Sequence, residues 1–468
     1  MSTRTEHDSL GPVEVPEDAL YGAQTQRAIE NFPVSGQRPH PDFVWAAVLV
    51  KKAAALANMR TGQLDPALGR AIVRAADEVL VEGRWWDQFV VDRFQAGAGT
   101  SHNMNANEVL ANRANELLGG ERGRYVPVHP NDHVNMAQSS NDAVPTMVRL
   151  AALRGWERLQ AALDVLADAL DAKTREFADV VKSGRTHLQD AVPLHLGDEF
   201  GAYRVTVDKA AEALESTASG LRGLNLGATA VGSGTNAADG YREEVVAVLG
   251  ELTGWALTPP RDYFQVTQSH DDLVRFSGAL RGLAVELAKI ADDLRLLSSG
   301  PRGGLGDLRL PAVQPGSSIM PGKVNPSMAE MLDMVAYRVI GNDLAVLLAG
   351  MHGQLDLNVF VPVMADALPT SLGILTNAVT VFAERCVRGI TADLPRLRAL
   401  VERNTALATA LAPTVGYEVA ARIAQRAVAE DLTIRDAALA EGVLDAGTLD
   451  RLLDLERLAG PGLPGGAA

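Results

Sequence analysis

Residues 273–297 read LVRFSGALRGLAVELAKIADDLRLL, and this run decides the fold. Large apolar side chains recur three and four positions apart along about seven helical turns. These positions are Leu273, Phe276, Leu280, Leu283, Leu287, Ile290, Leu294 and Leu297. A stripe of this length lets a helix bury one face against neighbouring helices. The run therefore predicts a long helix inside a bundle, and the stripe itself indicates core packing and no ligand site.

Other parts of the chain repeat this spacing. A second stripe runs from Trp156 to Val180 and is interrupted at Lys173. Further helices are predicted near residues 43–60, 103–118, 198–222, 327–350 and 363–389. No convincing series of alternating apolar and polar residues indicates strands. The expected fold class is therefore all-α, built on a helix bundle. Because the stripes carry more apolar surface than one chain can cover, we also expect an oligomer.

The composition restricts the class of partner. The 468 residues are 47% hydrophobic and 22% charged, as in an ordinary globular protein with a large core. A net charge of −15 argues against nucleic acid as the main partner, because phosphate binding needs a basic face. The single cysteine, Cys386, allows no intrachain disulfide. No long apolar run indicates a membrane span and the N-terminus has no apolar signal core, so we expect a cytoplasmic protein with no membrane partner.

Changes in turn content divide the chain into three predicted domains. Residues 1–138 are rich in turn signals and form an N-terminal mixed-helical domain. Residues 139–395 carry the long stripes and form the central bundle domain. Residues 396–468 alternate short helices with turns and form a small C-terminal helical domain. Its Gly- and Pro-rich end at 460–466 is expected to be mobile.

A loop punctuated by glycine and proline lies between two of the long helices. Residues 316–326 read GSSIMPGKVNP. Glycine lets the backbone approach a ligand closely, and proline fixes φ. Ser317 or Ser318 is a candidate nucleophile or base. Lys323 supplies a cation and Asn325 an amide. This combination suits a small, strongly anionic ligand.

Three more polar segments lie at helix boundaries. They are GAGTSHNMN at 97–105, QSSND at 138–142 and SGRTHLQD at 183–190. The first segment has the character of an anion pocket at a helix N-terminus, although an N-cap loop would also explain it. The second has more consecutive polar residues than one cap needs. A lone histidine is more often structural, but His187 stands beside Thr186 in a polar turn and is a candidate proton shuttle.

Other catalytic and cofactor motifs are missing from the sequence. It contains no His-Glu-x-x-His, no Cys-x-x-Cys and no Gly-x-x-x-x-Gly-Lys-Ser/Thr loop. His129 and His133 are four positions apart, but Pro130 argues against a regular metal-binding helix there. The glycines between 300 and 306 do not follow a strand, which argues against a dinucleotide site. These searches therefore find no recognisable metal or dinucleotide motif.

The 316–326 loop resembles, nearly letter for letter, the signature loop of the fumarase/aspartase superfamily. The resemblance extends over essentially the whole chain and includes RTEHD at 4–8 and YGAQTQR at 21–27. It implies a three-domain, all-α fold that assembles into homotetramers, whose long central helices form a 20-helix core. It also implies that each active site gathers segments from three subunits. Polar turns far apart in sequence could then cooperate on one substrate.

The resemblance further implies an elimination that forms fumarate and needs no metal and no organic cofactor. A proton leaves the carbon next to a carboxylate, and the charge moves into that carboxylate, which needs preorganised donors. By resemblance Ser317 is the base, and its alkoxide needs nearby donors and Lys323. Asn141 and His187 would face the leaving group, and Glu330 would orient His187. The other implied contacts to a small dicarboxylate substrate are Thr100, Ser101, Ser139, Ser140, Thr186, Ser318, Lys323 and Asn325.

The leaving group is either ammonia or water, because the sequence resembles both branches of the superfamily. Aspartase-like segments include NLGATA at 225–230 and GQLDLNV at 353–359. Ser140 is fumarase-like, and so is HPND at 129–132, which resembles a second anion site. The residues of that possible second site are His129, Asn131 and Asp132. We favour deamination of L-aspartate, with hydration of fumarate to L-malate as the alternative.

Two further hypotheses carry less weight. A related lyase could act on a larger fumarate adduct of the argininosuccinate type, but such relatives share the loop less closely. A non-catalytic protein could reuse the scaffold, and it would be expected to lack the base or the cation. Ser317, Lys323, Asn325 and His187 are all present, so an enzyme is favoured.

Overall fold

The computed structural model describes residues 2–462, and the chain divides into two compact units. The first unit comprises the chain up to Ala161, Ala210–Ala284 and Val335–Thr376. The second unit comprises Ala162–Lys209, Val285–Met334 and the chain from Asn377 onward. The three predicted domain boundaries stay a prediction. Residues 463–466 of the expected tail lie outside the described residues.

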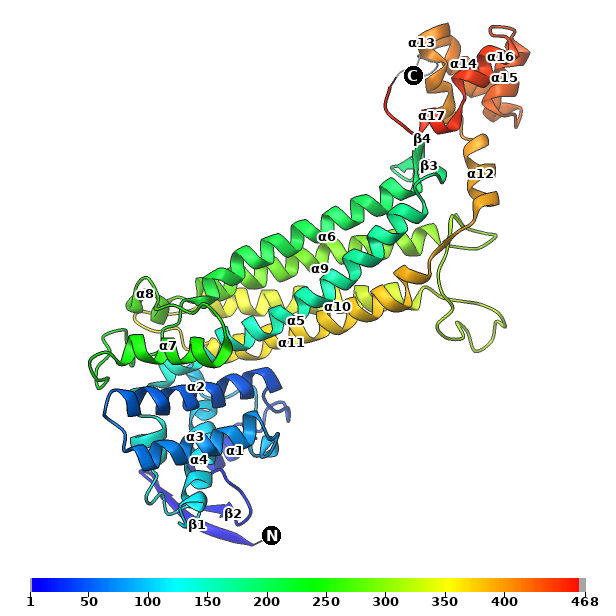
Figure 1. The fold of residues 1–468 in the computed structure, drawn as a ribbon. Helices are drawn as coiled ribbons and strands as arrows, with labels where there is room; N and C mark the ends of the chain where they lie inside the picture. Colours follow the sequence, from blue (N-terminus) through cyan, green and yellow to red (C-terminus); the bar gives the residue numbers. More distant parts are fainter. Residues whose placement is uncertain (1, 463–468) are drawn as a thin grey trace. The chain divides into compact units, whose positions relative to one another are not determined.

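Long helices form the main part of the fold and carry the predicted stripes (Figure 1). They are α5 (Ser140–Glu176), α6 (Leu196–Ala218), α9 (Asp271–Leu297), α10 (Ser327–Met351) and α11 (Val361–Arg385). Every predicted stripe position from Leu273 to Leu297 is at most 5% exposed. Burying one such side chain stabilises a fold by about 1.5–3 kcal/mol. The all-α prediction is confirmed, with helix boundaries within a few residues of those expected.

The interruption at Lys173 has a physical explanation. This side chain is 5% exposed, so its charge lies inside the fold. Its Nζ pairs with Glu176 Oε2 at 2.6 Å and donates to the Ile390 carbonyl oxygen at 2.7 Å. A buried ammonium is tolerated where partners of this kind satisfy it.

The first unit adds shorter helices and one hairpin to its parts of the long helices. The helices are α1 (Ala23–Asn31), α2 (Pro41–Arg60), α3 (Pro66–Leu80), α4 (Thr100–Leu117), α7 (Tyr241–Thr253) and α8 (Tyr263–Gln268). Short helical turns are η1 (Trp86–Gln88), η2 (Gly97–Gly99), η3 (Pro130–Val134) and η4 (Ser219–Arg222). Helix α2 packs on α3, α4 and α7. Strands β1 (Thr3–Asp8) and β2 (Gly11–Pro16) form an antiparallel pair.

The second unit contains two small sheets and the C-terminal helices. Strands β3 (Val181–Thr186) and β4 (Gln189–His195) form a hairpin, and β5 (Leu308–Arg309) pairs with β6 (Thr391–Ala392). The helical segments are η5 (Val387–Gly389), α12 (Leu394–Glu402), η6 (Thr405–Ala410), α13 (Ala412–Val415), α14 (Tyr417–Ala429), α15 (Ile434–Glu441), α16 (Ala446–Leu452) and α17 (Leu455–Leu458). Leu411, Ile423 and Leu449 lie in the core of the terminal helices.

The strands differ from the expectation that no strand series would be found. They are two to seven residues long and occur as isolated antiparallel pairs. Pairs this short give little room for an alternating pattern, and β5–β6 joins residues that are far apart in the chain. The hairpin at 181–195 matters for function because it carries the SGRTHLQD segment.

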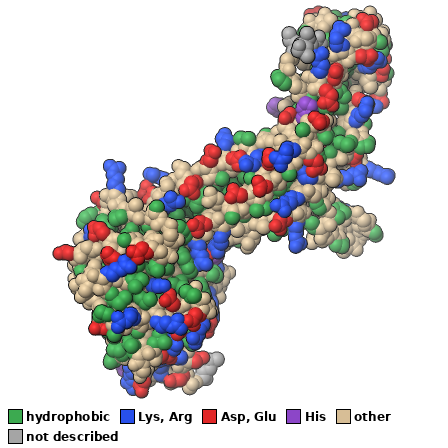
Figure 2. Space-filling view, viewed as in Figure 1, with side chains coloured by type: hydrophobic (Ala, Val, Ile, Leu, Met, Phe, Trp, Pro, Cys, Tyr) green, Lys and Arg blue, Asp and Glu red, His purple; other side chains and the backbone are tan. Residues whose placement is uncertain are grey.

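Helix α10 exposes an apolar face. Tyr337, Leu344 and Met351 recur about two turns apart and are 56–64% exposed, and Ile340 and Leu348 lie between them. Among the described residues, α10 is the one helix long and apolar enough to cross a membrane by length and composition. It also carries Asp333, Asn342 and Asp343, which are buried. On the face drawn in Figure 2, acidic and basic side chains are interspersed over the molecule.

Candidate functional site

The QSSND segment forms the beginning of α5. Ser139 Oγ accepts a hydrogen bond from Asn141 N at 3.3 Å, and Ser139 N donates to Asp142 Oδ1 at 2.8 Å. These reciprocal bonds form a capping box. The capping interpretation therefore holds for Ser139 and Asp142. The capping bonds do not use the side chains of Ser140 and Asn141.

A neighbouring loop at 225–230 fixes the amide of Asn141. Its Nδ2 donates to the Ala230 carbonyl oxygen at 2.8 Å. Because a carbonyl oxygen only accepts hydrogen bonds, the amide nitrogen must face Ala230. Its Oδ1 then points elsewhere and takes no hydrogen bond from any residue that the structure describes. The half-buried Asn141 thus presents an acceptor at the surface of the turn.

The GAGTSHNMN segment lies against the start of α5. A Cβ on Gly99 would be 2.7 Å from Val144 Cγ1, and the glycine has φ of +73°, so this close approach requires glycine. Helix α4 follows, and Gly99 at its N-cap offers no side-chain cap. Gln95 Oε1 accepts from His102 N at 3.0 Å and satisfies one first-turn donor. Thr100 is exposed and Ser101 nearly buried at this helix N-terminus, which suits an anion.

A buried lysine lies beneath these two segments. Lys51, on α2, is 0% exposed. Its Nζ donates to Asn103 Oδ1 at 2.6 Å, Asn135 Oδ1 at 3.1 Å and Gln138 Oε1 at 2.7 Å. Burial lowers the pKa of Lys51 to about 7, and the nearby Asp142 acts in the opposite direction. Three acceptors match the three N–H groups of an ammonium, so this arrangement satisfies the charged form.

In the second unit, the SGRTHLQD segment forms the β3–β4 hairpin. Thr186 pairs with Gln189, and the two turn residues between them are His187 and Leu188. Both have positive φ, of +54° and +59°, which is the backbone of a type I′ turn. Non-glycine residues rarely adopt this conformation, and such strain is concentrated at functional sites. The turn leaves Thr186 and His187 exposed.

The 316–326 loop closes on itself. Gly316 N donates to the Lys323 carbonyl oxygen at 2.8 Å, and Asn325 Nδ2 donates to the Gly316 carbonyl oxygen at 2.7 Å. A cavity of about 470 Å³ lies within it, lined in part by Ser317 and Lys323. Ser318 is exposed. The Lys323 ammonium makes no ion pair with any residue in the described part of the chain, so its charge is available to an anion.

Ser317 itself receives two backbone donors. Its Oγ accepts from Ile319 N at 3.2 Å and from Met320 N at 3.0 Å. Hydrogen bonds donated to an oxygen favour its negatively charged form. The loop therefore provides part of the stabilisation that a serine alkoxide needs. No other functional side chain among the described residues contacts Ser317.

The predicted site residues fall into two groups. The first unit holds Thr100, Ser101, Ser139, Ser140 and Asn141 around the start of α5. The second unit holds Thr186, His187, Ser317, Ser318, Lys323, Asn325 and Glu330. No hydrogen bond joins Glu330 to His187 among residues 2–462, so that orienting role stays a prediction. We call the two groups the first and the second half-site; that the members of each group act on one substrate stays a prediction.

The possible second anion site forms a tight turn at η3. His129 Nδ1 accepts from Asn131 N and from Asp132 N, both at 3.3 Å. The same nitrogen lies 3.4 Å from Asp132 Oδ2. As expected, Pro130 prevents a regular helix between His129 and His133. The role of this turn in anion binding stays a prediction.

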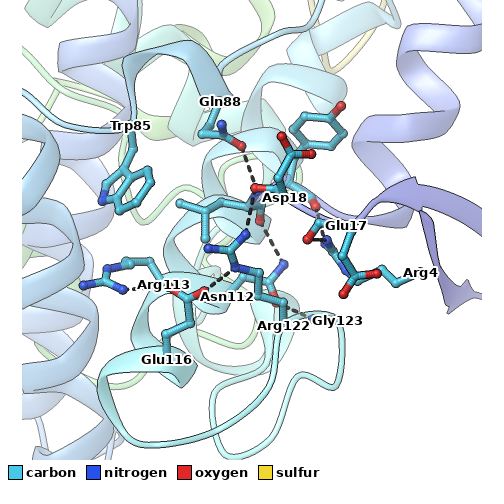
Figure 3. Close-up of polar contacts among 12 residues, drawn as sticks. Arg4, Glu17, Asp18, Trp85, Gln88, Asn112, Arg113, Glu116, Arg122 and Gly123 are labelled. Atoms are coloured by element: carbon cyan, nitrogen blue, oxygen red, sulfur yellow. Dashed lines mark hydrogen bonds and ion pairs between the residues drawn. The ribbon is translucent and has the colours of Figure 1, made fainter. Parts of the chain in front are cut away.

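A separate pocket near the N-terminus contains arginines, but they are already paired. It has a volume of about 550 Å³ and is lined by residues that include Arg4 and Arg122 (Figure 3). Arg4 makes two bonds to Glu6 Oε1, at 2.6 and 2.8 Å. Arg122 pairs with Glu116 and donates to the Asp18 carbonyl oxygen at 2.7 Å. These contacts stabilise the loop after α4 and leave little free positive charge for a substrate.

Sequence reasoning missed the buried layer beneath the first half-site. Lys51 sits within the apolar run VLVKKAAALA at 48–57, where a charge facing the core was the available signal. Asp142 was recognised as part of a polar turn, but its side-chain partners at Gly227 and Thr229 could not be read from spacing. In the described residues, no group of three His, Cys, Asp or Glu side chains is placed to hold a metal ion.

Comparison with known proteins identifies similar chains over the full length. The lyase family matches residues 11–341, and the fumarase C C-terminus family matches residues 407–460. A class II fumarate hydratase from Brucella suis is 47% identical over 461 residues, covering 98% of this chain and 99% of the relative. An aspartate ammonia-lyase from Bacillus sp. is 47% identical over 462 residues, covering 99% of this chain and 98% of the relative.

A solved structure is similarly close. The fumarate lyase:delta crystallin from Brucella melitensis, in a crystal structure bound to cobalt, aligns with a TM-score of 0.95 and 51% identity. The alignment covers 98% of this chain and 100% of that chain. The chain is thus equally similar to relatives that are named for two different reactions.

Proposed function

The chain belongs to the fumarase/aspartase superfamily of lyases, and from that premise we propose that it interconverts L-aspartate with fumarate and ammonia. The names of the relatives give two reactions, hydration of fumarate and removal of ammonia from aspartate, and loss of ammonia from aspartate would leave the same four-carbon unsaturated dicarboxylate. The choice between ammonia and water rests on the half-site at the start of α5.

Proton abstraction falls to Ser317. The Oγ of this serine already accepts two backbone hydrogen bonds, at 3.0 and 3.2 Å, which favour the alkoxide. The alkoxide takes a proton from the carbon next to one substrate carboxylate, and the electron pair moves into that carboxylate. The pair then returns to form the carbon–carbon double bond as the C–N bond breaks and ammonia leaves. Lys323 and the second Nδ2 hydrogen of Asn325, whose first is donated to Gly316, bind the carboxylate whose charge increases, so their interaction strengthens in the transition state.

The orientation of Asn141 is the observation that carries the choice of ammonia. An ammonium group has three donors and no acceptor, so its pocket must offer acceptors. Because Nδ2 is held by Ala230, Asn141 offers Oδ1. Thr100 and Ser140 add hydroxyl oxygens that can also accept. A departing hydroxide would instead need a donor, and one of the two Nδ2 hydrogens of Asn141 is already donated to Ala230, so this amide favours an ammonium group over a hydroxide.

A second candidate is fumarate hydratase. Relatives with this name are as similar to the chain as those named aspartate ammonia-lyase. Ser140 also resembles the hydratase branch, and its hydroxyl could donate as well as accept. In that case His187, as an imidazolium, would supply the proton that the leaving hydroxide takes up.

The complete active site is proposed to form in a homotetramer. Each half-site alone lacks part of the machinery: the base and cation lie in the second unit and Asn141 lies in the first. The exposed apolar face of α10, with Tyr337, Leu344 and Met351, is a surface that further copies of the chain would cover. We propose that three subunits contribute to each site. The proposed steps use protein groups only, and we place the enzyme in the cytoplasm.

The direct test compares two substrates with one purified sample. Formation of fumarate from L-aspartate and from L-malate is followed by ultraviolet absorbance under identical conditions. We expect rapid turnover of L-aspartate and at most slow turnover of L-malate. Turnover of L-malate without turnover of L-aspartate would replace the first candidate by the second.

A further inference from the structure

We propose that Asp142 is a positioning residue, which acts through the 225–230 loop to hold the Asn141 amide with its acceptor oxygen toward the leaving group. This inference rests on the proposed function and deepens it. It assigns a role to NLGATA, a segment that resembles aspartases but contains none of the predicted substrate contacts.

Asp142 is enclosed by backbone donors. It is 0% exposed. Its Oδ2 accepts from Gly227 N and from Thr229 N, both at 2.9 Å, and its Oδ1 accepts from Ser139 N at 2.8 Å. Charge-assisted bonds of this kind are about twice as strong as bonds between neutral groups. One carboxylate therefore joins the α5 turn to the 225–230 loop.

The loop adopts an uncommon backbone conformation around this carboxylate. Gly227 has φ of +92° and Thr229 has φ of +56°, so both lie in the left-handed region. Backbone N–H groups can converge on an anion when neighbouring residues adopt such conformations. The hydroxyl of Thr229 is buried without a partner among the described residues, so the residue is kept in this conformation without help from its side chain. The bonds to Asp142 offset that strain.

The position of the loop determines the orientation of Asn141. Ala230 directly follows Thr229, and its carbonyl oxygen accepts the Asn141 Nδ2–H at 2.8 Å. A second contact runs from Asn225 Nδ2 to the Asn141 carbonyl oxygen at 3.4 Å. If the loop moved, Nδ2 would lose its partner and the amide could turn through 180°. The site would then present a donor where an ammonium group needs an acceptor.

The charges near Asp142 fit this role. Lys51 of α2 attracts the carboxylate, and Tyr241 of α7 places its buried hydroxyl nearby. Burial raises the pKa of Asp142 to about 6, although the three backbone donors and Lys51 act to lower it. Three backbone N–H donors converge on its two oxygens, an arrangement that suits the charged carboxylate. Burying a charge costs stability, and the three backbone donors together with Lys51 offset that cost.

The test uses Asp142→Asn. The change keeps the shape but replaces one acceptor oxygen by an NH2 group. Since both carboxylate oxygens accept backbone N–H groups, either orientation of the new amide sets a donor against a donor. We expect kcat/KM for L-aspartate to fall about 30-fold or more. The inhibition constant of succinate, a dicarboxylate without an amine, should change less than about threefold.

The matched control is Thr229→Gly. It keeps the backbone N–H that Asp142 accepts, and it removes both the strain and the unpartnered hydroxyl. We expect kcat/KM within about threefold of the wild type and a melting temperature that is equal or higher. Hydrogen exchange of peptides covering 225–230 should accelerate in Asp142→Asn and stay unchanged in Thr229→Gly. Gly227→Ala is the second variant if Asp142→Asn does not fold, with the same direction expected.

Two outcomes would overturn the inference. One is Asp142→Asn with wild-type kcat/KM, which would show that the carboxylate has no influence on the site. The other is loss of L-aspartate turnover and succinate binding by the same factor, which would indicate general disruption. If the unmutated enzyme turned over L-malate but not L-aspartate, the proposed function would be wrong. The hydrogen exchange comparison would then decide whether Asp142 holds the loop.

Discussion

Arg185 and Asp307 form a bidentate ion pair, in which Arg185 Nη1 lies 2.6 Å from Asp307 Oδ2 and Arg185 Nη2 lies 3.1 Å from Asp307 Oδ1. Asp307 is 0% exposed, so its carboxylate depends on this guanidinium and on Lys182, 3.8 Å away. The pair ties the hairpin that carries His187 to the chain just before the Ser317 loop. The pair thus holds the hairpin against the segment that leads to the Ser317 loop, although no hydrogen bond or ion pair of the described residues joins the hairpin turn to residues 316–326.

Replacing Arg185 by lysine should impair this half-site. Lysine offers a point charge and cannot form two parallel bonds to a carboxylate. We expect kcat to fall about tenfold and the melting temperature to drop by a few degrees, because Asp307 stays buried with one partner fewer. Steady-state kinetics and thermal unfolding measure both effects. Arg175→Lys, on a side chain that is 70% exposed, is the control and should change neither.

Ser317→Ala tests the assignment of the base. The variant loses the proton acceptor but no core contact, since Ser317 Oγ accepts only the two N–H bonds of its own loop. We expect kcat to fall by about 1,000-fold or more with little change in melting temperature. Ser318→Ala, on the adjacent exposed serine, should mainly raise KM. Activity of Ser317→Ala within tenfold of the wild type would show that another group is the base.

Mixing two inactive variants tests whether the half-sites meet between subunits. Ser317→Ala removes the base from the second unit, and Asn141→Ala removes the acceptor from the first. When the variants are unfolded together and reassembled in equal amounts, about a quarter of the sites should receive both intact halves if the halves come from different subunits. Assay of the mixture should then recover activity that neither variant has. A mixture as inactive as its components would place both halves in one subunit.

Buried neutral histidines should make stability depend on pH. Burial lowers the pKa of His102 to about 3 and that of His270 to about 3. In the unfolded chain these groups titrate near pH 6.5. Their contribution to stability is therefore present above pH 6.5 and is lost as pH falls toward 3. Between pH 7 and pH 5, protonation of each of these histidines in the unfolded chain should lower the free energy of unfolding by about 2 kcal/mol.

Urea unfolding at the two pH values checks this dependence. His270→Gln should lose less stability between pH 7 and pH 5 than the wild type, because one titrating group is gone. His352→Gln, at an exposed position, should show the wild-type loss. If the free energy of unfolding depended on pH equally in the wild type, His270→Gln and His352→Gln, His270 would be protonated at pH 5 in the folded state as well.

The bundle could be predicted because its helices are long and regularly patterned. From Leu273 to Leu297 the eight stripe positions repeat over many turns, and each of the eight is buried. The strands could not, since β5 and β6 have two residues each and come from distant parts of the chain, and the β3–β4 hairpin turns at His187 without glycine. A type I′ turn is normally signalled by asparagine and glycine, and here the conformation is imposed by the surrounding structure.

The site was predictable in part for a similar reason. The hydroxyls and amides at helix boundaries were visible as clusters, and Ser317, Lys323 and Asn325 stand together in one loop. The partners of Asp142 lie about 85 residues further along the chain, where only folding brings them together. The partners of Lys51 could not be predicted for another reason. They are neutral amides, so no opposite charge in the sequence indicates them.

Consumption of fumarate with and without ammonium is the most direct measurement of the central claim. The purified enzyme is mixed with fumarate at neutral pH, absorbance is recorded, and an ammonium salt is then added to the same sample. An ammonia-lyase leaves fumarate unchanged until ammonium is present and then consumes it, with L-aspartate as the product. That is the result we predict. Rapid consumption of fumarate before ammonium is added, with L-malate as the product, would contradict the account.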